Sequence, residues 1–93
     1  LDAENKYEVS GGNVNQWKEM VDKGEINEAE NLLLDEMDYK SREAVEEAIW
    51  FYGYVSEKGE AFLRAHDYSE EEVFDGLQML AEKSGYGELI GLL

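Results

Sequence analysis

The chain is short, strongly acidic and free of cysteine and proline. Its 93 residues carry 23 acidic and 8 basic side chains, a formal net charge of −15 at pH 7. A chain of this length is expected to form one domain. Without cysteine there is no disulfide, thiolate metal site or thiol nucleophile. The negative charge repels nucleic-acid phosphates, which disfavours direct nucleic-acid binding and favours a basic protein partner.

The absence of disulfides fits a reducing compartment, and we expect a cytoplasmic protein. No apolar run approaches the roughly 20 residues of a membrane-spanning helix, so no membrane contact is expected. Residues 1–12 are polar and end in two glycines, which predicts a flexible tail before a single domain at 13–93. Because the chain starts at Leu1 rather than methionine, we expect an upstream segment to be missing.

Two short helices are expected next. Asn13 is a suitable cap for a helix that ends at Lys23 and Gly24. Asn27, with Glu30 at the reciprocal capping-box position, predicts a second helix that runs to about Met37. The apolar stripe of the first helix comprises Val14, Trp17, Met20 and Val21, and that of the second Ala29, Leu32, Leu33, Leu34 and Met37.

The stretch AVEEAIWFYGYV, residues 44–55, is the richest in aromatic side chains and predicts a helix capped by Ser41. On a helical wheel its apolar residues fill one side. The other side holds Glu46, Glu47 and Gly53, together with Trp50 and Tyr54 at i,i+4 spacing. Either the helix is enclosed by its neighbours, or these two aromatics form an exposed patch for a partner or a second copy. Gly53 costs about 1 kcal/mol relative to alanine, which suggests a bend or a close backbone approach.

The C-terminal half predicts a short helix over 60–65, with Phe62 and Leu63 inward, and a longer one to Ser84. Ser69 and Glu72 form a capping box for the longer helix, and Gly85 ends it. Its expected inward stripe comprises Val73, Phe74, Leu77, Leu80, Ala81 and Ser84. The final apolar residues, Leu89, Ile90, Leu92 and Leu93, are expected to fold back on the body or to form a homodimer contact.

Catalytic and metal-binding motifs are missing from the sequence, and we expect no enzyme, no catalytic residues, no metal and no cofactor. The single histidine, His66, precedes Asp67. A small enzyme built on His66, Asp67 and Glu36 is a remote alternative, which requires the three side chains to share a cleft.

Two stretches carry a resemblance to known families. KGEINEAENLLLDEMD, residues 23–38, resembles the second half of a tetratricopeptide (TPR) hairpin, although Glu36 and Ser41 replace its small residue and proline. Residues 14–85 look like a family of small uncharacterised Firmicutes proteins. The matching features are AENLL at 29–33, the Phe51-Tyr52 pair, a short helix, and the Tyr68-Ser69 cap. That resemblance implies a helical fold in a bacterial protein and no known activity.

These observations predict an all-α protein: a small helical bundle of about five helices arranged as TPR-like antiparallel hairpins. The expected function is protein–protein interaction, as an acidic adaptor or regulatory module. Trp50, Tyr54, Leu92 and Leu93 are the expected partner-binding residues. An acidic mimic of nucleic acid, which occupies a basic site on another protein, is the alternative.

Overall fold

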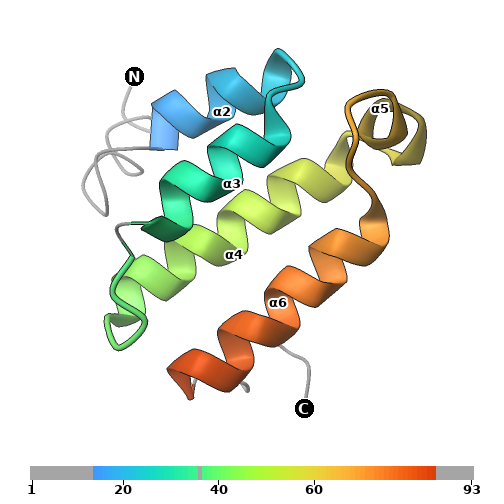
Figure 1. Cartoon of the computed structure of the whole chain (residues 1–93). Coiled ribbons are helices and arrows are strands. Elements are labelled where there is room, and N and C mark those ends of the chain that lie inside the picture. Colours follow the sequence, from blue (N-terminus) through green and yellow to red (C-terminus); the bar gives the residue numbers. More distant parts are fainter. Residues whose placement is uncertain (1–13, 36, 86–93) are drawn as a thin grey trace.

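The computed structural model describes residues 14–35 and 37–85, and within these ranges it contains five α-helices and no strand (Figure 1). The first antiparallel pair is α2 (Val14–Asp22) and α3 (Ile26–Asp35), joined by a short turn. The prediction of a small all-α bundle is confirmed. The resemblance to TPR hairpins in particular stays a prediction.

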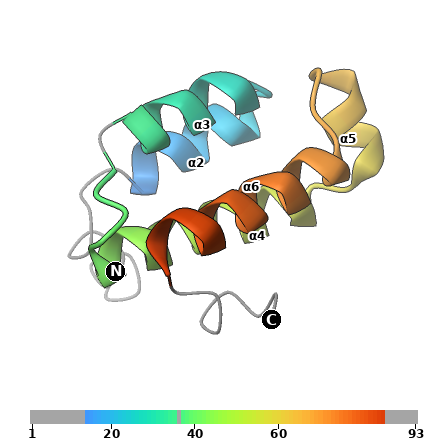
Figure 2. The same ribbon diagram turned by 60° about the horizontal axis from the view of Figure 1, so that its bottom comes forward.

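The remaining helices are α4 (Arg42–Glu57), α5 (Glu60–Ala65) and α6 (Glu70–Ser84). Helix α4 lies at the centre, with the α2–α3 pair on one side and α6 returning antiparallel along the other (Figures 1 and 2). The short α5 turns the chain between α4 and α6 at one end of the bundle. A helix that contacts α2, α3 and α6 must be apolar over most of its circumference. The aromatic sequence of α4 meets that requirement.

Local capping signals place three of the helix ends where the sequence predicts them. The Ser41 hydroxyl accepts a hydrogen bond from the Ala44 N–H at 3.2 Å, and α4 begins at the next residue. Ser69 caps α6 in the same way through the Glu72 N–H. Gly85 ends α6 in the left-handed conformation, with φ at 81°. Each signal depends on residues within one turn of the helix, so sequence is sufficient to find it.

The predicted Asn27 cap is wrong. Helix α3 begins at Ile26, two residues before the start that an Asn27 cap implies, and the carbonyl of Glu25 accepts its first helical hydrogen bond, from Ala29, at 3.0 Å. The chain can turn this early because Gly24 adopts a φ of 89°. The Asn27 amide donates instead to the Asp67 carbonyl, at 3.2 Å.

The hydrophobic core fills the space between α4 and its neighbours. Two of its residues, Ile26 and Tyr68, lie outside the apolar stripes that the sequence predicts. The predicted inward position of Phe74 is wrong, because its side chain is 53% exposed. Helix α6 faces the core through Val73, Gly76 and Leu80. Phe74, two positions before Gly76, therefore points away from the core. The largest fully buried side chains are Trp17, Tyr52, Phe51, Ile26, Leu63, Leu80, Val21, Val45 and Val55.

Two glycines permit close approach between elements. Gly76 lies under the ring of Tyr52, whose hydroxyl donates to Glu30 at 2.6 Å. Burial, followed by this hydrogen bond to Glu30, raises the pKa of Tyr52 well above its usual range. Gly24 lies against the imidazole of His66. These contacts hold α6 to α4 and the α2–α3 turn to the end of α5.

Candidate partner-binding groove

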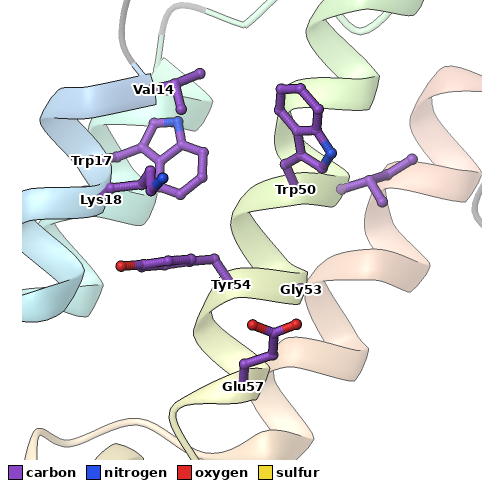
Figure 3. A pocket seen from close by; sticks show the side chains of 8 residues that line it. Val14, Trp17, Lys18, Trp50, Gly53, Tyr54 and Glu57 are labelled. Carbon is purple, nitrogen blue, oxygen red and sulfur yellow. The ribbon is translucent and has the colours of Figure 1, made fainter. Parts of the chain in front are cut away.

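An open groove of about 400 Å³ runs between α2 and α4 (Figure 3). Helix α2 supplies one wall and α4 the other, and the Tyr54 ring extends from α4 toward α2. Helix periodicity explains which residues of α4 line the groove, because positions i, i+3, i+4 and i+7 share one face of a helix. The groove is lined by Val14, Trp17, Lys18, Ile49, Trp50, Gly53, Tyr54 and Glu57.

The α2 wall is fixed by a buried polar contact. Trp17 is 2% exposed, and its Nε1–H donates to the Glu47 carboxylate at 3.1 Å. The sequence placed Glu47 on the outer side of the aromatic helix, whereas the structure leaves only 6% of it exposed. The Trp17 ring also meets Phe51 and Tyr54 edge to face, at centroid distances of 5.3 and 5.9 Å. Trp17 therefore has little freedom to move.

A charged cluster surrounds Tyr54, one of the residues that line the groove. Asp22 on α2 accepts hydrogen bonds from the Tyr54 hydroxyl at 2.6 Å and the Lys58 ammonium at 2.5 Å. The Lys58 and Lys18 ammonium groups lie 5.0 and 5.4 Å from the centre of the Tyr54 ring. The hydrogen bond from Lys58, and then that from Tyr54, lowers the pKa of Asp22. The same bonds to Asp22 raise the pKa of both Tyr54 and Lys58.

The Asp22→Asn variant tests this cluster through pH. Because the folded-state pKa of Asp22 lies below its unfolded value, near 3.9, its contribution is present above about pH 4 and is lost as pH falls through the folded pKa. The cluster is exposed, so we expect a loss of no more than about 1 kcal/mol at neutral pH. Urea unfolding of the wild type and the variant at about pH 7 and pH 3 measures the loss of unfolding free energy at each pH. A loss of unfolding free energy that is the same at both pH values would contradict the lowered pKa of Asp22. Glu60→Gln, whose ion pair with Arg64 lies within α5, is the control.

The exposed strip of α4 combines an aromatic residue with acids. Along the helix it consists of Glu43, Glu46, Trp50, Gly53 and Glu57, all exposed, and Trp50 is 41% exposed. Tyr54, at the edge of this strip, is half-buried against α2. The structure thus brings Trp50 and Tyr54 together in one groove but covers them unequally. Their role in binding a partner stays a prediction.

The other residues considered from sequence fall elsewhere. Leu92, Leu93 and Glu36 lie outside the described residues. The His66 ring packs on Phe62, with centroids 4.6 Å apart, and against Gly24, while the Asp67 carbonyl binds Asn27. Sequence reasoning missed Trp17 and Glu47 as a pair. The available signal was that a buried tryptophan N–H needs an acceptor, which Glu47 on a largely apolar helix could provide.

The fold and the groove define the class: a small all-α bundle with an open cleft between two of its helices. Residues 1–85 match the model of a family of unknown function, DUF6483, and the chain belongs to that family. The searches of curated proteins and of solved structures found no match. No helix in the described ranges 14–35 and 37–85 is long and apolar enough to cross a membrane.

Proposed function

We propose that the chain is a non-enzymatic protein–protein interaction module whose contact surface is the groove between α2 and α4. The observation that carries the proposal is the 41% exposed Trp50 beside a groove whose other aromatic residues are packed in place. Tryptophan is among the residues that contribute most to binding at protein interfaces. A wall fixed by Trp17 and Glu47 reduces the ordering cost of binding.

Charge supports a basic partner. Basic side chains at several positions already pair with the chain's own carboxylates, as in Arg42–Glu46, Lys58–Asp22 and Arg64–Glu60. On the exposed strip, Glu43 and Glu57 form no ion pair with any residue that the structure describes. With a net charge of −15, the chain attracts cationic surfaces at long range. A reducing cytoplasm is the compartment that suits a chain without cysteine.

Affinity capture from the native host tests the proposal with Trp50→Ser as the bait variant. Phe74→Ser is the matched control, because Phe74 is 53% exposed yet does not line the groove. We expect wild-type and Phe74→Ser baits to retain the same partner in high salt and Trp50→Ser to lose it, since aromatic contacts resist screening. Retention of that partner by Trp50→Ser would count against the groove as the contact surface.

A further inference from the structure

No close contact within the described fold accounts for Gly53. It lies inside α4, which continues as helix to Glu57, so the glycine does not end the helix. No described atom outside its own helix lies within 4 Å of the position that a Cβ would take. Glycine in a helix interior lowers stability relative to alanine. Of the two glycines inside helices in residues 14–35 and 37–85, Gly76 is explained by the ring of Tyr52, whereas Gly53 faces the open groove.

Resting on the proposed function, we infer that the groove binds a basic amphipathic helix and that Gly53 is the point of closest approach. A missing Cβ lets a second helix backbone approach α4 more closely than any other residue would. Trp50, one turn before Gly53, then packs beside an apolar side chain of the incoming helix. Helix-in-groove recognition of this kind uses apolar anchors at i, i+3, i+4 and i+7.

The strip also indicates the length and charge of the occupant. From Glu43 to Glu57 it extends for about 21 Å, which corresponds to roughly four helical turns. Glu43 lies on one side of Trp50 and Glu57 on the other, and neither forms an ion pair with a described residue, whereas Glu46 already pairs with Arg42. The occupant is therefore a helix with a small residue in the middle of its apolar face and lysine or arginine toward both ends. An acidic or neutral helix lacks this complementarity.

A labelled 16-residue helical peptide of lysine, leucine and alanine, with alanine at the centre of its apolar face, is the probe. Fluorescence anisotropy measures its affinity for wild-type protein and for Gly53→Ala. We expect Gly53→Ala to raise the Tm by about 4 °C and to weaken peptide binding by about tenfold. A peptide with leucine at the central position should bind wild-type protein more weakly than the alanine peptide. Phe74→Ala should leave the affinity for both peptides unchanged.

The outcomes separate this inference from the proposed function. If Trp50→Ala loses the peptide while Gly53→Ala binds it as tightly as wild type, the close approach at Gly53 is wrong and the groove stands. If neither variant affects binding, or a scrambled peptide of equal charge binds equally, the groove is not the site. Concentration-dependent dimerisation that is abolished by Gly53→Ala would overturn the basic helix in favour of a second copy. Opposite effects of Gly53→Ala on stability and affinity support the inference.

Discussion

The Gly24→Ala variant is expected to lose about 3 kcal/mol of unfolding free energy, because two separate costs coincide at this residue. Gly24 adopts a φ of 89°, which disfavours any residue with a Cβ by about 1–2 kcal/mol. An alanine Cβ at this position would also overlap the imidazole of His66. That ring is itself packed against Phe62, which limits its freedom to move aside. Overpacking of this kind costs about 1–3 kcal/mol.

Chemical denaturation of a matched set separates the two costs. Gly85 also has a positive φ, 81°, but no described atom lies within 4 Å of its Cβ position, so Gly85→Ala measures the backbone cost alone, about 1 kcal/mol. In a His66→Ala background the overlap is removed, and Gly24→Ala should cost about as much as Gly85→Ala. Equal losses for Gly24→Ala and Gly85→Ala in the wild-type background would show that the imidazole moves aside freely.

The helix starts at α4 and α6 could be predicted because their signals are local. The hydroxyls of Ser41 and Ser69 bind N–H groups three residues onward, within the same turn. Asn27 carries the same chemistry but lies inside the first turn of α3, and its amide donates to a carbonyl 40 residues away. A sequence pattern shows which hydrogen bonds a side chain can form. It does not show which partner the tertiary structure places within reach.

The candidate site was predictable to the extent that helical periodicity determines it. The spacing of Trp50 and Tyr54 shows that they share a side of α4, which the structure confirms. Their unequal exposure depends on where α2 lies, and no periodicity contains that information. The Trp17–Glu47 hydrogen bond joins residues 30 positions apart. The wall of the groove could therefore be described only from the packed structure.

Glycines inside helices carry information that the apolar pattern misses. The predicted stripe of α6 included Phe74, on the basis of hydrophobicity, and omitted Gly76. The structure reverses the two, because the Tyr52 ring requires a neighbour without a side chain. Once Gly76 faces α4, Phe74 must point outward. In α6 the glycine, rather than the nearby phenylalanine, therefore marks the face that contacts α4.

Gly76→Ala is expected to destabilise the protein by about 2 kcal/mol, although the same change in an ordinary helix stabilises it by about 1 kcal/mol. The new methyl group would overlap ring atoms and the hydroxyl of Tyr52, which is fully buried. If the ring shifts, it also loses its hydrogen bond to Glu30, worth about 1 kcal/mol. The sum of these losses exceeds the gain in helix propensity. Urea unfolding followed by circular dichroism measures the difference.

Gly53→Ala is the matched control, since it makes the same change in the interior of a neighbouring helix. No described atom lies within 4 Å of its Cβ position, so the substitution changes only the helix propensity. The unfolding free energy of the variant should therefore be higher by about 1 kcal/mol. In a Tyr52→Leu background the overlap at Gly76 disappears, and Gly76→Ala should become neutral or stabilising. Equal effects of the two glycine substitutions in the wild-type background would refute the contact between Gly76 and Tyr52. Opposite signs would show that packing, rather than propensity, requires the glycine in α6.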